Sequence, residues 1–204
     1  MTLAAWGQQP FPPTLSFTLD FPGSNPDHYV ITVAADGKAS YDSTGKLTPE
    51  SEDDPFHLEF DLPPATAGEF FELAKKAGYF EGNVDSGKQK LASTGIKTLA
   101  YHDAERNTRA QYNYSTNAAV QQLTSRFQDL SQTLEFGRRL DYYHHYQKLA
   151  LDDETKSLDS LYSRKAAELL PIAPILQQLL VDQSVITPVR MRVQRLLTAA
   201  GVTK

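Results

Sequence analysis

The chain has 204 residues, of which 40% are hydrophobic, and a formal net charge of -5. This content is enough for a substantial core, and the acidic balance gives no electrostatic basis for a nucleic-acid partner, which needs clustered Lys and Arg. The absence of cysteine excludes disulfides, thiolate catalysis and zinc sites built on Cys. No apolar run approaches the roughly 18–20 residues that span a bilayer, so we expect no integral membrane segment.

Residues 1–13 are predicted to be a flexible N-terminus or the remnant of a signal peptide. Ala5 and Gly7 are small residues two apart, and a polar, Pro-rich stretch follows them, as around a signal-peptide cleavage site. The basic segment and most of the apolar segment of a leader are missing. Export to the periplasm or the secreted space is therefore one expectation, and an ordinary flexible N-terminus of a cytoplasmic protein is the other.

The first part of the chain predicts half-buried strands. Apolar residues alternate with polar ones over 14–21, a period of two that indicates a strand with one buried face. Asp36-Gly37 separates two runs rich in β-forming residues, 28–34 and 38–43, which is a strong hairpin signal. Residues 44–55 hold two prolines and four acids and are predicted to be a solvated loop. Alternation resumes over 56–62, where another strand is expected.

A helix and a second hairpin are expected next. Pro63 and Pro64 end the preceding strand and start a helix, with Gly78 placed as its C-terminal cap. Residues 81–94 are polar and contain Gly, which predicts a loop. The second hairpin pairs 95–101 with 108–114.

A long helix from Ser115 to about Ala150 organises the rest of the chain, with Ser115 as its N-cap. At a rise of 1.5 Å per residue it would be about 50 Å long, so it should project from the body or serve as a spine. Its apolar residues follow the spacing of a single buried stripe, and these are Val120, Leu123, Phe127, Leu130 and Leu134.

The remaining residues predict helices that return along the long one. Asp152 is a candidate N-cap of a helix ended by Pro171, Pro174 starts a short helix through Val181, and Thr187 begins the last one. The fold class is therefore α+β. A mainly antiparallel sheet with one packed helix, 14–115, is followed by a helical section, 116–204, which is built on the long helix and packs on the sheet.

The polar face of the strand over 56–62 offers one candidate site. His57, Glu59 and Asp61 are side chains of types that bind a divalent metal, but a spacing of two sets neighbours about 7 Å apart, too far for all three to hold one ion. The favoured interpretation is the solvent face of a half-exposed sheet. We predict that folding needs no metal or organic cofactor.

A second candidate is an aromatic and histidine-rich stretch near the end of the long helix. It offers imidazoles and aromatic faces for binding, through Tyr142, Tyr143, His144, His145 and Tyr146. The two histidines point about 100° apart on a helix and cannot jointly hold one metal, whereas Tyr142 and Tyr146 share a face. Either these rings continue the buried seam, or they form a surface for a partner.

One resemblance covers about the first 115 residues. The pattern from Tyr29 to Tyr41, followed by a strand and by a helix that carries Phe70 and ends near Gly78, resembles bacterial exported domains of unknown function. Such domains have no agreed catalytic residues, so the resemblance assigns no residue role. The helical remainder has no counterpart among them.

Two classes of function remain open. The favoured one is a non-catalytic binding module of the cell envelope or secreted space, which contacts another protein, or a second copy of itself, through the helical section. The alternative is a small-ligand-binding protein or a hydrolase that uses the sheet face around His57 or the aromatic-histidine stretch. A buried titratable pair in a pocket would favour the enzyme, and exposed apolar surface on the helices would favour the binding module.

Overall fold

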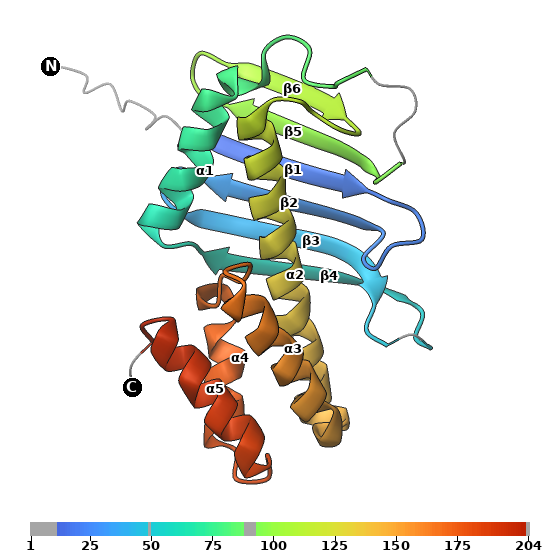
Figure 1. The fold of residues 1–204 in the computed structure, drawn as a ribbon, viewed down its shortest axis with the longest axis vertical. Helices are drawn as coiled ribbons and strands as arrows, with labels where there is room; N and C mark the ends of the chain where they lie inside the picture. The colour runs from blue at the N-terminus through green and yellow to red at the C-terminus, as the bar shows by residue number, and fades with distance from the viewer. Residues whose placement is uncertain (1–11, 49, 88–92, 203–204) are drawn as a thin grey trace, which may run out of the picture.

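A computed structural model describes residues 12–48, 50–87 and 93–202. Its described residues form one antiparallel sheet of six strands in the order β4-β3-β2-β1-β5-β6, with two helices on one face and further helices beyond the β4 edge (Figure 1). The predicted α+β class is thus confirmed. The residues around Ala5 and Gly7, on which the export expectation depends, lie outside the described part of the chain.

The strands follow the alternation of the sequence. Their bounds are β1 Thr14–Asp20, β2 His28–Ala34, β3 Lys38–Lys46, β4 Asp53–Asp61, β5 Ile96–His102 and β6 Asn107–Tyr112. The helices are α1 Pro64–Lys76, α2 Ala118–Tyr146, α3 Leu151–Ser163, α4 Ala173–Val181 and α5 Thr187–Ala199. Short 3-10 turns lie at η1 Gly78–Phe80, η2 Lys148–Ala150 and η3 Leu170–Ile172.

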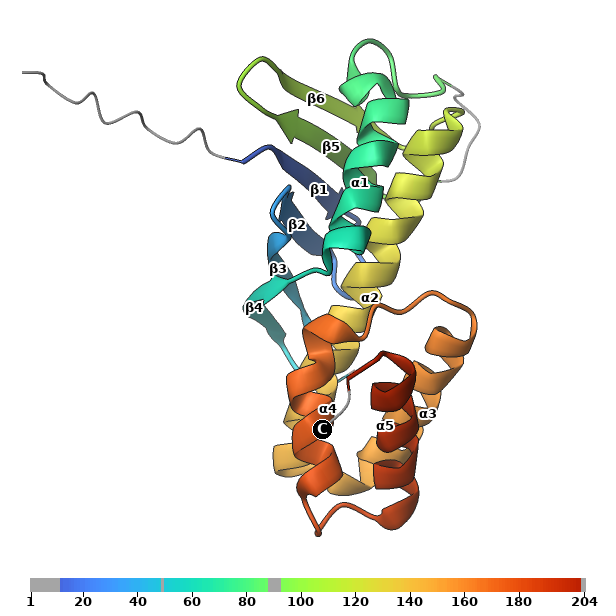
Figure 2. The ribbon, with the colours of Figure 1, turned by 90° about the vertical axis from the view of Figure 1, so that its left-hand side faces the viewer.

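Only one face of the sheet is covered by the described helices. Leu15, Phe17 and Leu19 of β1 are buried under α1 and α2, whereas the polar residues between them face the opposite side. Figure 2 shows the sheet with both helices on the same side. Burial of one face is what the period-two pattern predicts, because successive strand side chains point to opposite faces.

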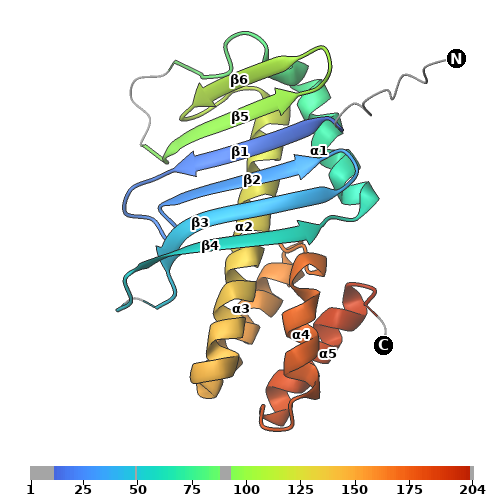
Figure 3. The same cartoon turned by 180° about the vertical axis from the view of Figure 1, so that it is seen from behind.

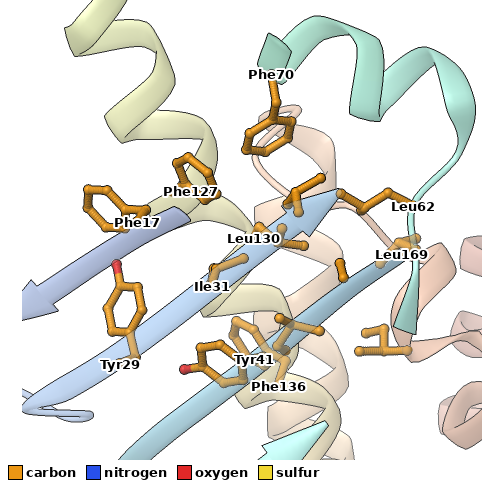
Figure 4. Close-up of a cluster of buried hydrophobic side chains, with 14 of the residues drawn as sticks. Phe17, Tyr29, Ile31, Tyr41, Leu62, Phe70, Phe127, Leu130, Phe136 and Leu169 are labelled. Carbon is orange, nitrogen blue, oxygen red and sulfur yellow. The ribbon is translucent and has the colours of Figure 1, made fainter. Parts of the chain in front are cut away.

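The centre of the core lies where β1, α1 and α2 meet. The ring of Phe127 stacks on Phe17 with centroids 5.2 Å apart and meets the edge of Phe70 at 4.7 Å (Figure 4). Full burial of one such ring contributes about 1.5–3 kcal/mol relative to exposure. The stripe predicted on the long helix is therefore the seam that packs on the sheet.

The loop predicted over 44–55 is wrong at both ends, since β3 continues to Lys46 and β4 begins at Asp53. Backbone pairing extends through Gly45 and Asp54 to this point. A Cβ on Gly45 would lie 2.6 Å from Oδ1 of Asn25, whose side chain also bonds both backbone groups of Lys46. The sequence of the loop did not indicate this extension of the strands, because the contacts that stabilise it come from Asn25, in a turn that is distant along the chain.

Two predicted N-caps are also wrong. Asn117, not Ser115, caps α2 and accepts from the backbone N–H groups of Ala119 and Val120. Helix α3 begins at Leu151 without a side-chain cap, and Asp152 instead pairs with Arg192 at 3.1 Å. At α2 two capping residue types, Ser115 and Asn117, stand two positions apart, so sequence alone does not choose between them. At α3 the residue before the helix is Ala150, which has no capping side chain.

Helix α3 ends at Ser163, well before Pro171. Lys165 adopts a positive φ of 59°, and the N–H of Ala166 bonds the carbonyl of Leu161, as in a helix that closes through a left-handed residue. A lysine at this position gave no sequence signal, because glycine is the usual residue there. Leu169 is nevertheless buried, from the segment that leads into η3.

Helix α2 connects the two parts of the molecule. Its 29 residues, about 44 Å in length, cross the sheet and continue past the β4 edge, where α3 and α4 pack against it and α5 packs on α3 and α4 (Figures 1 and 3). Phe136 and Leu140, in the part of α2 that leaves the sheet, are both buried. The hydrophobic core therefore continues from the sheet into the helical section.

Candidate functional site

The row of polar side chains on β4 lies on the uncovered face of the sheet. Nδ1 of His57 is 2.7 Å from Oδ1 of Asp42, and its Nε2 is 3.2 Å from Oε1 of Glu59. Asp61 pairs with Lys38 at 2.8 Å instead. The structure thus brings together His57 and Glu59 but not Asp61, and no group of three potential metal ligands occurs within the described segments.

The contact with Asp42 raises the pKa of His57 above its usual value of about 6.5, first through the hydrogen bond and then through charge. The stabilisation from this pair is fully present below pH 6.5 and is lost as the pH rises through the raised pKa. We expect an NMR titration of the His57 ring to show a midpoint that falls in the Asp42→Asn variant. The same midpoint in both proteins would contradict this assignment.

The residues of the aromatic-histidine stretch differ in exposure and lie on different sides of the end of α2. The rings of Tyr142 and Tyr146 lie 5.1 Å apart, as their spacing predicts, and Tyr146 is 74% exposed. Tyr143 is half-buried against the core, and His145 lies on the exposed side near Asp141. Nε2 of His144 is 2.8 Å from Oδ2 of Asp182, at the end of α4.

Asp182 joins the two turns at the far end of the helical section. Its carboxylate also accepts from Lys148, at 2.8 Å, and from Ser184. These contacts hold the pKa of Asp182 far below its usual range, with the bond from Lys148 as the main cause. The turn between α2 and α3 is therefore fixed beside the turn between α4 and α5. Sequence reasoning did not foresee this contact.

A buried polar network lies where α2 leaves the sheet. Oε1 of Glu135 accepts from the hydroxyls of Tyr41, at 2.8 Å, and Ser43, at 2.7 Å. Oε2 lies 3.6 Å from Nη1 of Arg138, and Nη2 of this arginine donates to the carbonyl of Asp54 at 2.8 Å. Burial, followed by the charge of Glu135, raises the pKa of Tyr41 far above its usual range. The only sequence signal for this network is an acid and a base three apart beside the apolar seam.

A cleft of about 290 Å³ opens next to this network, between β4 and the η3–α4 segment. Its lining comes from β4, α2, η3 and α4 and includes Phe56, Leu58, Leu134, Arg138, Ile172 and Ile175. Residues so far apart in sequence come together only in the fold, and we did not predict this cleft. The local sequence signals for this cleft are an unusual glycine within α2, Gly137, and two prolines, Pro171 and Pro174.

The close approach of η3 to α2 depends on Gly137. A Cβ at this position would lie 2.5 Å from Cγ2 of Ile172, closer than side-chain carbons approach in folded proteins. The missing side chain allows η3 to seat against α2, and this contact sets one wall of the cleft.

No known protein family matches this chain, and no curated protein is detectably similar to it. Within the described segments, none of the helices combines the length and the apolar character that crossing a bilayer requires.

Proposed function

We propose that this protein is a non-catalytic binding module that contacts another protein through the end of its helical section. The observation that carries the proposal is the exposure of large apolar side chains there. Leu149 is 87% exposed and Tyr146 is 74% exposed, although both belong to a section whose other large apolar residues mostly pack inward. Aromatic and large apolar side chains are characteristic of the centres of protein interfaces.

Two turns contribute to this surface. Val181 is 60% exposed and Ile186 is 45% exposed, and both flank the turn that Asp182 fixes beside the end of α2. We call Tyr146, Leu149, Val181 and Ile186 the helical tip. Both turns lie at the end of the helical section remote from the sheet (Figure 1). Because the tip is a projection, the complementary partner surface is an apolar groove, with a polar group for the Tyr146 hydroxyl.

The burial of the network around Glu135 favours a binding module over the hydrolase alternative. Glu135 is 5% exposed, and the two hydroxyl groups that it binds belong to Tyr41 and Ser43, which are 0% and 4% exposed. A catalytic carboxylate needs access to substrate and a hydrogen bond that can be given up during the reaction. Here the carboxylate is enclosed and its hydrogen bonds stabilise the packing of α2 on β3.

Loss of the apolar side chains should abolish the proposed contact. We expect the wild-type protein to capture one partner from native extract, and Tyr146→Ser/Leu149→Ser to bind the isolated partner at least about tenfold more weakly, because interface centres carry most of the affinity. Calorimetry with the isolated partner gives the ratio.

The matched control is Ile96→Ser, which removes a side chain that is 50% exposed on β5, far from the tip. This control should bind like the wild type. Equal affinity of the double variant, with its circular dichroism unchanged, would refute the proposal. A wild-type mass twice that of the double variant by light scattering would show instead that the occupant is a second copy of the chain.

We also propose the cell envelope or secreted space as its location, as for the exported domains that residues 1–115 resemble. The support is the pattern around Ala5 and Gly7 together with that resemblance. Immunodetection in cytosolic and periplasmic fractions and in the medium tests the location independently of the partner. Recovery in the cytosol alone would contradict it.

A further inference from the structure

The cleft between β4 and the η3–α4 segment has the character of a small-molecule site. Its apolar wall includes Phe56, Leu58, Ile172 and Ile175, and its volume of about 290 Å³ is close to the lower limit for pockets that enclose an organic ligand. The wall is held by elements with little freedom, since Gly137 seats η3 closely on α2 and prolines flank Ile172. An apolar ring can therefore enter a largely preformed space.

The charges around the cleft favour a cation. Arg138 lies within the lining, but its charge is matched by Glu135 at 3.6 Å and by Asp54 at 3.2 Å. Asp141, also in the lining, has a carboxylate that is 59% exposed, and its one ion-pair contact within the described segments is to His145, at 3.7 Å. A carboxylate ligand would add a further negative charge to this excess of acids, whereas an ammonium group beside Asp141 would reduce it.

Arg138 belongs to the enclosed part of the lining. Its side chain is 5% exposed, and its Nη1 atom is enclosed and makes no hydrogen bond to any residue that the structure describes. A buried donor without an acceptor is unfavourable, and more so when the group is charged. A ligand in the cleft therefore meets a guanidinium whose charge is already matched by Glu135 and Asp54.

We propose that this cleft binds a small arylalkylammonium compound, with its ring against the apolar wall and its ammonium group at Asp141. The ligand class goes beyond the protein contact proposed for the helical tip. The two sites have no residue in common, so either one can fail without the other.

Tyramine, which has a phenol ring, a hydroxyl and an ammonium group, is the probe. We expect saturable NMR shift changes at the lining residues with a Kd on the order of 1 mM, as the size of the probe allows. The counter-probe, 3-(4-hydroxyphenyl)propionate, keeps the ring and hydroxyl but carries a carboxylate. It should bind at least about tenfold more weakly, because its charge faces the same acids.

Asp141→Asn tests the ammonium site with little change of shape. It should weaken tyramine binding about three- to fivefold, as expected for a partly exposed ion pair. The control Asp153→Asn removes a carboxylate that is 90% exposed on α3 and should leave the affinity unchanged. The proposal is overturned if the propionate binds as tightly as tyramine, if Asp141→Asn has no effect, or if tyramine produces no saturable shifts at the lining.

Discussion

Replacement of Glu135 by Ala is expected to lower the free energy of unfolding by about 3 kcal/mol, because it leaves Arg138 buried without its internal carboxylate. Both side chains are almost fully enclosed, at 6% and 5% exposure. The same change removes the acceptor shared by Tyr41 and Ser43. Urea unfolding followed by circular dichroism measures the loss. Glu69→Ala, which breaks an exposed ion pair with Arg126, should cost less than about 1 kcal/mol.

The double variant Glu135→Leu/Arg138→Met separates the cost of an unpaired buried charge from the net contribution of the ion pair to the free energy of unfolding. Removing both charges avoids the buried cation, so the loss should be smaller than the sum of the two single losses by at least about 1 kcal/mol. Strictly additive losses would show that the two side chains act independently, and our description of the network would be wrong.

The second large effect is expected at Gly137. Alanine usually stabilises a helix interior relative to glycine by about 1 kcal/mol, but a Cβ here would clash with Ile172 at 2.5 Å. Overpacking of this kind costs about 1–3 kcal/mol, and the methyl that must move is part of a buried branched side chain. We therefore expect Gly137→Ala to destabilise the protein by about 1–2 kcal/mol, measured by thermal and urea unfolding.

The matched control is the same substitution on α1. Around Gly68 nothing lies within 4 Å of an added Cβ, so Gly68→Ala should stabilise the protein by up to about 1 kcal/mol. The two variants should thus change stability in opposite directions. Ile172→Ala in the Gly137→Ala background should cost less than it does in the wild type, because the clash is relieved. Stabilisation by Gly137→Ala would show that η3 does not pack closely on α2.

Features with a local physical cause were predictable from the sequence. The buried row of Leu15, Phe17 and Leu19 follows from strand geometry, and the packed stripe from Val120 to Leu134 follows from the helical period. The boundaries were less predictable, as at Asn117, where neighbouring residues compete for the cap, and at Lys165, where a non-glycine residue takes a left-handed conformation.

The candidate sites were less predictable than the fold, because their geometry depends on distant segments. Tyr142 and Tyr146 were expected to share a face, and they do, but the contact of His144 with Asp182 depends on how α4 returns along α2. The network around Glu135 needs β3 beneath α2, and the cleft needs η3 to reach β4. No spacing of residues along the sequence predicts either arrangement.

Photo-crosslinking from the helical tip tests most directly whether this end of the molecule docks another protein. A benzophenone amino acid is placed at position 149 or, as a control, at position 96, and each protein is irradiated in native extract. We predict one discrete adduct from position 149 that disappears when Tyr146→Ser is added, and no such adduct from position 96. The same adducts from both positions, or an adduct from position 149 that persists with Tyr146→Ser, would contradict the account.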